Sequence, residues 1–544
     1  MSPLLPTLLQ ALPSYGASGP LPSVEITQVT ADSRQVQPGA LFVAVQGGAA
    51  DGHRFIADAI RRGAAAVVGT DPLTPETTEV VTTSRAPYIR VADSRAALAR
   101  LSAAFFNYPS RSMRVVGVTG TDGKTTTSNL IYHLLGAAGL HPGMISTVGA
   151  RIGQEALDTG LHVTTPDAPD VQRYLAQMRD AGCQAAVLEA TSHGLHQGRV
   201  AAVDFDVAVV TNITHEHLDY HGTWEAYLAA KALLFHSLAA AQPKPLAVTS
   251  DVSRFTFQAD AQPKTAVLNA DDASYPHLRA IPAGRILSYG LEDAAADLRA
   301  TEIVYQAQRT TFVATTPAGP TRIELPLPGR FNVTNALAAL AAGLALGLPL
   351  EPMAAALAVM PGVDGRMERI ERGQDFVAMV DFAHTPISLQ RALEAVRPMT
   401  RGRVIAVFGS AGLRDVQKRS LMAAASLRLA DLTILTAEDP RVESLDTILA
   451  QMAEGAQQAG GVEGRTFWRI PDRTAAILAA VEMAQPGDVV IVCGKGHEES
   501  MCFGEIEHPW RDQPVLAWAL ERRLGQTDAA APFWLPTSDP RITP

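Results

Sequence analysis

The chain has 544 residues, 47% of them apolar and 18% charged, which is the balance of an ordinary globular protein. At about 100–200 residues per domain, this length predicts roughly three domains. The net charge of −10 argues against a dedicated nucleic-acid binder, because such proteins usually need a basic field. The three cysteines form no metal-type pair or disulfide framework, and no stretch is apolar over a membrane-spanning length. We therefore expect a cytoplasmic protein without membrane insertion or nucleic-acid partners.

The first domain is predicted over residues 1–111. A strand is expected at Leu41–Val45, an Ala-rich helix at Phe55–Arg62 and another strand at Ala65–Val68. The segment Thr70–Pro87 is rich in Thr and Pro and is predicted to be a loop. These elements indicate a small α/β domain.

The second domain is predicted over residues 112–362, where apolar, β-branched runs alternate with helical segments. Each run ends in a polar cluster, which is where an open parallel sheet places its ligands. The expected elements are strands at Val115–Val118, Ala185–Leu188 and Val207–Val210, and helices at Lys124–Leu135 and Thr334–Gly347.

The third domain is predicted over residues 363–544. Strands and helices alternate again, which favours a second doubly wound, Rossmann-like α/β domain. The Pro-rich end, Thr527–Pro544, is predicted to be a loose tail. The expected elements are strands at Val404–Phe408, Leu432–Thr436 and Val489–Val492, and helices at Lys418–Leu429, Leu445–Glu454 and Arg473–Ala484.

A glycine loop follows the strand Val115–Val118 and precedes a helix. Glycine lets backbone amides turn toward a phosphate, the helix N-terminus adds partial positive charge, and a lysine supplies a full charge. Val118 stands where the general phosphate-loop pattern has its first glycine, so a plain tight turn is the alternative. The Lys-Thr-Thr ending favours a nucleoside triphosphate site. Its residues are Gly120, Thr121, Asp122, Gly123, Lys124, Thr125 and Thr126.

With this loop, further motifs occur in an order that resembles the Mur ligase family, and within it the E-type enzymes. The resemblance covers most of the chain. Its motifs are Gly120–Thr126, Thr164–Asp167, Glu189–Arg199, Asn212–Gly222, Lys231, Gly329–Asn335, Gly365–Glu368, Asp381–Pro386, Glu438–Arg441 and Gly494–Glu498.

The resemblance implies an ATP-dependent ligase of peptidoglycan synthesis. E-type enzymes add a diamino acid to UDP-N-acetylmuramoyl-L-alanyl-D-glutamate. ATP first phosphorylates the terminal carboxylate, and an amine then attacks the acyl phosphate. The first step brings anions together and requires cations, which Lys124 and Mg²⁺ would supply.

The resemblance also implies metal ligands. Thr125 offers a hydroxyl, and Glu189 offers a carboxylate at a strand end. His217 is similar to the family's second ligand, although the residues alone do not separate it from His215 and His221. Lys231, fourteen residues after His217, matches a lysine that the family carbamylates to an N-carboxylysine. A solvated helix lysine is the alternative for Lys231.

Other matching positions imply contacts with the nucleotide and the UDP substrate. Asp32–Arg34 and Gly47–His53 are similar to the uridine-diphosphate site, although a plain turn is a strong alternative. The implied nucleotide contacts are Asn335, Arg366, Asp381 and His384. The implied substrate contacts are Ser33, Thr164, Thr165, Ser192, Gln197 and Arg199.

The acceptor site is implied by a third group of residues, Arg414, Asp439, Arg441, Gly494 and Glu498. Enzymes that take meso-diaminopimelate carry Asp-Asn-Pro-Arg, and this chain has Asp439 where Asn is usual. The extra negative charge suits the ammonium of lysine or ornithine and disfavours a carboxylate, unless Arg441 neutralises it. We expect meso-diaminopimelate, with L-lysine or L-ornithine close behind.

Two alternatives remain at this point. Folylpolyglutamate synthetase shares the loop and the ATP residues, but it lacks the long unit before the loop. A non-catalytic ATP-binding homologue would be expected to lose Lys124, Glu189, His217 or Lys231, all of which are present. We expect a monomer.

Overall fold

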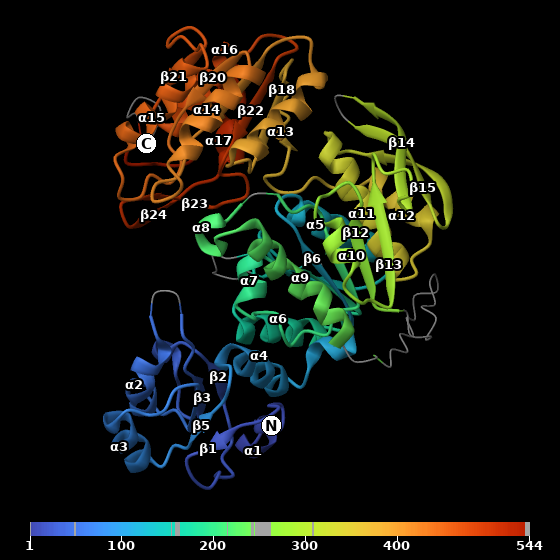
Figure 1. Cartoon of the computed structure of the whole chain (residues 1–544). Helices are drawn as coiled ribbons and strands as arrows, with labels where there is room; N and C mark the ends of the chain where they lie inside the picture. The colour runs from blue at the N-terminus through green and yellow to red at the C-terminus, as the bar shows by residue number, and fades with distance from the viewer. Residues whose placement is uncertain are drawn as a thin grey trace. The chain divides into compact units, whose positions relative to one another are not determined.

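The structure is a computed structural model that describes residues 2–47, 50–153, 155–157, 164–214, 216–240, 244, 263–306 and 309–538. It divides into two compact units, Met1–Leu298 with Ala338–Met353 and Arg299–Leu337 with Ala354–Pro544, each described by itself. Figure 1 shows the helices and strands along the chain. The predicted α/β class is confirmed by three sheets of mainly parallel strands. Among the described residues, no helix is long and apolar enough to cross a membrane.

The N-terminal sheet has the order β1-β5-β4-β3-β2, with all neighbours parallel except β1 and β5. Its strands are β1 (Gly16–Ala17), β2 (Gln28–Thr30), β3 (Ala40–Val43), β4 (Ala66–Gly69) and β5 (Tyr88–Arg90). Its helices are α1 (Leu5–Leu9), α2 (Ile56–Arg61), α3 (Pro75–Ser84) and α4 (Ser94–Phe105).

The loop prediction for Thr70–Pro87 was wrong, because this segment contains α3. Thr74 caps the helix by accepting from the backbone N–H of Thr77, and Pro75 occupies the first turn, where proline is tolerated. Only Val81 of this helix is buried. Local capping therefore forms α3 despite its poor apolar pattern.

In the first unit, the central sheet has the order β13-β12-β11-β6-β10-β7-β8-β9. The six strands from β13 to β7 are parallel, so the loops after β6, β10 and β11 meet at one edge. The strands are β6 (Arg114–Thr119), β7 (Pro142–Ser146), β8 (Gly149–Ile152), β9 (Glu155–Leu157), β10 (Ala185–Glu189), β11 (Val207–Val210), β12 (Thr265–Asn269) and β13 (Arg285–Gly290). The helices are α5 (Lys124–Ala137), α6 (Ala168–Asp180), α7 (Ser192–His196), α8 (Leu218–His221), α9 (Trp224–Ala240) and α10 (Tyr275–Arg279).

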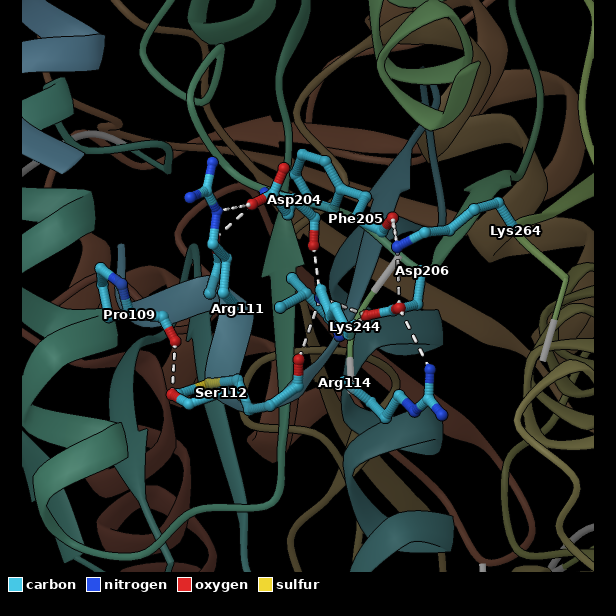
Figure 2. A network of polar contacts seen from close by, with 12 residues as sticks. Pro109, Arg111, Ser112, Arg114, Asp204, Phe205, Asp206, Lys244 and Lys264 are labelled. Atoms are coloured by element: carbon cyan, nitrogen blue, oxygen red, sulfur yellow. Dashed lines mark hydrogen bonds and ion pairs between the residues drawn. The ribbon is translucent and has the colours of Figure 1, made fainter. Parts of the chain in front are cut away.

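A buried charge network ties together the opposite edge of this sheet (Figure 2). The carboxylate of Asp206, just before β11, accepts from the backbone N–H of Val115 at 2.7 Å. It also pairs with Lys244 at 2.5 Å, Lys264 at 2.9 Å and Arg114 at 3.4 Å. Three cations around one carboxylate hold the starts of β6, β11 and β12.

Downstream, β14 (Leu298–Tyr305), β15 (Thr310–Thr316) and β16 (Gly319–Leu325) form an antiparallel meander. The sheet of the second unit has the order β17-β18-β22-β19-β20-β21 and is parallel except at β17. Its strands are β17 (Glu368–Arg369), β18 (Val377–Asp381), β19 (Val404–Phe408), β20 (Leu432–Leu435), β21 (Phe467–Arg469) and β22 (Val489–Cys493), followed by the hairpin β23 (Ser500–Phe503) and β24 (Ile506–Pro509). The helices α11 (Arg330–Ala345) and α12 (Leu350–Ala358) each contribute residues to both units. The helices of the second unit are α13 (Pro386–Val396), α14 (Gln417–Leu429), α15 (Leu445–Gln458), α16 (Arg473–Met483) and α17 (Asp512–Arg523).

The prediction of a loose tail was wrong for residues 527–538, and residues 539–544 lie outside the described part. The backbone carbonyl of Ala529 accepts from the indole N–H of Trp518 on α17. Ala531 and Leu535 are buried in the same hydrophobic core as α16 and α17. The buried side chains of Ala531 and Leu535 therefore anchor this irregular segment to the core, although its sequence has no helical periodicity.

Replacing Leu535 by alanine is expected to lower the free energy of unfolding by about 2–5 kcal/mol, because a fully buried leucine leaves a cavity. Denaturant unfolding measures this loss. Trp534→Ala is the matched control, since the neighbouring Trp534 is 54% exposed and should cost about 1 kcal/mol or less. Equal losses for the two variants would contradict the packing of this segment.

Candidate active site

The glycine loop lies between β6 and α5, as predicted, and is held against the end of β11. A Cβ atom on Gly120 would lie 1.8 Å from the hydroxyl of Thr211, and Gly120 has φ +151°, so only glycine fits. The backbone N–H groups of Thr121 and Asp122 donate to the carbonyl and side-chain oxygens of Asn212. Gly123, with φ 81°, caps α5. This backbone is of the kind that cradles phosphates.

The side chains of the loop bring a cation and two hydroxyls to this edge. The ammonium of Lys124 donates to the carbonyl oxygen of Thr121 at 2.7 Å. Thr125 and Thr126 are buried in the first turn of α5. The loop therefore places one full positive charge beside a helix N-terminus.

Glu189 lies at the end of β10 and is 1% exposed. Its carboxylate accepts from the hydroxyl of Thr125 at 3.0 Å and from the backbone N–H and hydroxyl of Thr147 at 3.0 and 2.9 Å. The structure thus brings together Thr125 and Glu189, two predicted metal ligands from different elements. Thr147 was missed, because nothing in its local sequence marks it.

Lys231 is buried on α9, although lysine is among the residues least often buried. Its ammonium donates to the carbonyl oxygen of Gly120 at 2.6 Å and lies 4.5 Å from the ring centroid of Tyr227. Burial and the nearby charge of Lys124 lower the pKa of Lys231 well below its usual value. Tyr227, which also contacts the hydroxyl of Thr121, was missed by the sequence predictions.

His217 lies in a cluster of aromatic side chains. Its ring is 4.9 Å from that of His193, which in turn lies 4.2 Å from that of Tyr220. Burial and the neighbouring histidines lower the pKa of His221 to about 4, so this ring is neutral at pH 7. His215 lies outside the described residues. His217 has φ 55°, a left-handed conformation that histidine tolerates better than most residues.

The residues predicted for the muramoyl dipeptide lie in two segments, one just before α6 and the other in and after α7, which follows Glu189. Arg199 donates to the carbonyl oxygen of Thr165 at 2.6 Å and to the side chain of Gln197 at 2.8 Å. Thr164 accepts from Thr147 at 3.1 Å. Ser192 begins α7, and its buried hydroxyl has no partner among the described residues. Direct contacts therefore connect Thr165, Gln197 and Arg199, whereas the hydroxyl of Ser192 bonds to none of them within the described part of the chain.

In the N-terminal sheet, Ser33 is buried in a short helical turn that Asp32 caps. Asp51, His53 and Asp71 lie close enough to suggest a metal site. However, the ring of His53 bonds to Asp51 through Nδ1 at 2.7 Å and accepts from the backbone N–H of Thr70 through Nε2 at 3.0 Å. Both ring nitrogens of His53 are engaged in these hydrogen bonds, so we interpret the cluster as structural support for the loop and not as a metal site.

In the second unit, three of the four residues predicted for the nucleotide lie around the end of β18, and the fourth, Asn335, lies on α11. Asp381 accepts from the backbone N–H groups of Met367 and Ala383 at 2.7 and 2.8 Å. The guanidinium Cζ of Arg366 lies 4.3 Å from the ring centroid of Phe382, and the ring of His384 lies 4.5 Å from the same ring. Asn335 is buried on α11 and donates to the side chain of Asn332.

His497 lies in the same group and was missed as a candidate. Its ring is 4.9 Å from that of Phe382. Burial and the positive charge of Arg366 lower the pKa of His497 to about 3. This histidine is therefore neutral at the working pH.

The acceptor residues come from loops after β19, β20 and β22, at the carboxyl edge of the second sheet. Asp439 does not pair with Arg441; its two oxygens accept from Lys495 at 2.9 and 3.0 Å. Lys495 also pairs with Glu498 at 2.5 Å. Arg414 is exposed on the loop after β19. The sequence predictions omitted Lys495.

Gly494 approaches a carboxyl group of the same edge. A Cβ atom on Gly494 would lie 2.2 Å from Oε2 of Glu438, so a side chain there would displace this group. Glu438 is 5% exposed, and its burial raises its pKa to about 7. The motifs Glu438–Arg441 and Gly494–Glu498 are thus packed as one surface.

Family models match three successive parts of the chain. The model described as "Mur ligase family, catalytic domain" matches residues 25–106. "Mur ligase middle domain" matches residues 118–343, and "Mur ligase, glutamate ligase domain" matches residues 365–496. The chain belongs to the Mur ligase family. It is an ATP-dependent ligase that forms amide bonds, as the glycine loop and the order of the motifs predicted.

Relatives of this Mur ligase match over nearly its whole length. A UDP-N-acetylmuramyl-tripeptide synthetase of Roseiflexus sp. (strain RS-1) is 47% identical over 91% of this chain and 94% of its own. A UDP-N-acetylmuramoyl-L-alanyl-D-glutamate--2,6-diaminopimelate ligase of Geobacillus thermodenitrificans is 40% identical over 95% and 99%. A solved structure with the same ligase name has a TM-score of 0.65 and 31% identity, covering 95% and 99%. These matches favour the muramoyl-peptide ligase over the folylpolyglutamate alternative.

Proposed function

We propose that this Mur ligase adds meso-diaminopimelate to UDP-N-acetylmuramoyl-L-alanyl-D-glutamate in peptidoglycan synthesis, with L-lysine and L-ornithine as the next candidates. One observation carries the choice of acceptor. The carboxylate of Asp439 forms an ion pair with Lys495, and the guanidinium of Arg441 has no ion pair among the described residues. An unpaired guanidinium suits a distal carboxylate, which diaminopimelate has and lysine lacks.

The metal site proposed for Mg²⁺ comprises Thr125, Glu189, His217 and Lys231. The donor set fits, because Mg²⁺ prefers oxygen ligands and two oxygen-bearing side chains already meet within 3.0 Å. When bound, Mg²⁺ supplies positive charge to phosphate oxygens. The hydroxyl of Thr125, on α5, and the carboxylate of Glu189, at the end of β10, would hold the ion.

Lys231 would join this set as an N-carboxylysine. Carbon dioxide reacts with a neutral amine, and the lowered pKa of Lys231 favours that form. Burial against Gly120 fixes the side chain beside the loop. The product would be an anion in a place where an unmodified lysine adds a further cation.

The remaining roles follow from charge and position. Lys124 would leave the carbonyl of Thr121 and neutralise the γ-phosphate while the substrate carboxylate attacks it. Asn335, Arg366, Asp381 and His384 would bind the nucleotide, and Arg199, with its guanidinium beside Gln197, would bind the anionic peptide. The other substrate contacts proposed are Ser33, Thr164, Thr165, Ser192, Gln197, Arg414, Gly494 and Glu498.

Division at residues 1–111, 112–362 and 363–544 is also proposed, with a UDP-substrate domain, an ATP domain and an acceptor domain. We propose a cytoplasmic monomer.

Phosphate release with the UDP-muramoyl dipeptide and each of meso-diaminopimelate, L-lysine and L-ornithine tests this function. Diaminopimelate is expected to give the highest kcat/KM. Replacing Arg441 by alanine should raise the KM for diaminopimelate by about tenfold or more, because its carboxylate loses a charge-assisted partner. The KM for L-lysine should change much less. Phosphate release with lysine alone would overturn the choice of acceptor, and no release with any amine would overturn the ligase function.

A further inference from the structure

The acceptor edge contains a cluster of three charges, defined here as the Lys495 cluster: Asp439, Lys495 and Glu498. The ammonium of Lys495 lies 2.9 and 3.0 Å from the oxygens of Asp439 and 2.5 Å from Oε2 of Glu498. Its side chain is 2% exposed, whereas that of Glu498 is 38% exposed. One buried cation is therefore shared by a carboxylate of each acceptor motif.

The carboxylate of Asp439 is held by contacts within the acceptor edge. Besides Lys495, its Oδ1 accepts from the backbone N–H of Cys502 at 2.9 Å. Its backbone is left-handed, with φ 38°, and its carbonyl accepts from the N–H of Gly412. Its carboxylate and its backbone carbonyl are thus both engaged, and Lys495 is the cation that lies against its charge.

Glu498 differs, because only one of its oxygens is engaged among the described residues. Oε2 pairs with Lys495, and Oε1 is left for a ligand. Burial alone would lower the pKa of Lys495, but Glu498 and Asp439 outweigh it and raise the pKa. Lys495 therefore stays charged while it neutralises Asp439 and orients Glu498.

We propose that Lys495 is a positioning residue that sets acceptor preference by keeping the charge of Asp439 away from Arg441. With Asp439 neutralised, Arg441 binds the distal carboxylate and Oε1 of Glu498 binds the distal ammonium. Without Lys495, Asp439 competes for Arg441, and the site turns toward an acceptor whose distal end is only cationic. This inference rests on the proposed function.

The experiment compares kcat and KM for meso-diaminopimelate, L-lysine and ATP in the full-length enzyme, by phosphate release. The variants are Lys495→Met, Asp439→Asn, the double variant and Lys495→Arg. Lys495→Met should raise the KM for diaminopimelate by about tenfold or more, with the KM for ATP changed by less than about twofold. The KM for lysine should fall or stay unchanged. Asp439→Asn in the Lys495→Met background should restore most of the diaminopimelate KM, because the competing charge is gone.

The rescue separates positioning from support of the fold. Asp488→Asn is the control, since Asp488 pairs with Arg403 at the start of β22, the opposite edge of the sheet. It should lower thermal stability without changing the preference. Equal losses for both acceptors and ATP in Lys495→Met, unrelieved by Asp439→Asn, would overturn the proposal. If Lys495→Met does not fold, the charge-conserving Lys495→Arg should keep the preference for diaminopimelate, and so should the double variant. Loss of the preference in either variant, with intact folding, would overturn the proposal.

The same kinetics keep the two proposals apart. A wild-type enzyme that uses lysine and not diaminopimelate would overturn the choice of acceptor. The change in lysine KM on Lys495→Met, and its reversal by Asp439→Asn, would still decide the role of Lys495.

Discussion

Replacing Lys124 by methionine is expected to lower kcat for phosphate release by about 10³-fold or more. Phosphorylating a carboxylate brings two anions together, and Lys124 is the cation of the glycine loop. Methionine keeps the length of the stem and removes the charge. Steady-state phosphate release at saturating ATP measures this loss.

The fold should tolerate this change. The ammonium of Lys124 bonds to a loop carbonyl, and the side chain contributes little to any core. The thermal unfolding midpoint and the binding of the UDP-muramoyl dipeptide should therefore stay close to those of the wild type. Turnover within about tenfold of the wild type would contradict the role of Lys124 at the γ-phosphate.

Replacing Asp206 by asparagine should lower the free energy of unfolding by about 3–5 kcal/mol, because three cations lose their common partner. Asp204 provides the matched control, since it pairs with the half-exposed Arg111 nearby (Figure 2). Asp204→Asn should cost about 1 kcal/mol or less. Denaturant unfolding at pH 7 compares the two, and equal losses would contradict the network.

The contribution of Asp206 should also depend on pH. Burial would raise its pKa, but Lys244 and Lys264 outweigh burial and lower it. A lowered carboxyl pKa gives stability that is present above the ordinary value, about 4, and is lost as the pH falls through the lowered pKa. The difference between wild type and Asp206→Asn should therefore shrink on acidification and stay constant from pH 5 to pH 7, below the pKa of Lys244, which burial lowers to about 8. A difference that grew on acidification would contradict this assignment.

Elements with strong apolar patterns could be predicted from the sequence. The strand at Val207–Val210 is found as predicted, and the helix predicted at Lys124–Leu135 is found with its end slightly later, at Ala137. The sequence of a buried parallel strand is a continuous apolar run, so its position can be predicted from local composition. The antiparallel strands β14 to β16 were missed, because buried residues are interspersed with exposed or half-exposed residues along β14 and β16, so neither strand has a continuous apolar run. The Pro- and Gly-rich composition of this region also favoured a loop.

The site could be predicted only where motifs name its residues. Glu189 and Thr125 were expected together, and the structure brings them together. Thr147, Tyr227 and Lys495 were missed, because each acts through a contact with a residue distant in sequence. The sequence predicts that Asp439 adds a negative charge to the acceptor site, but it does not show which cation pairs with this carboxylate. In the structure that cation is Lys495.

Asp439 and Arg441 both have left-handed backbones on either side of Pro440. Asparagine is one of the few residues that enters this conformation at low cost, and aspartate is another. The backbone at this position therefore accepts either residue, and a single nucleotide change interconverts their codons. An exchange of aspartate for asparagine at this position therefore changes the charge that lies against Lys495 without requiring the loop to refold.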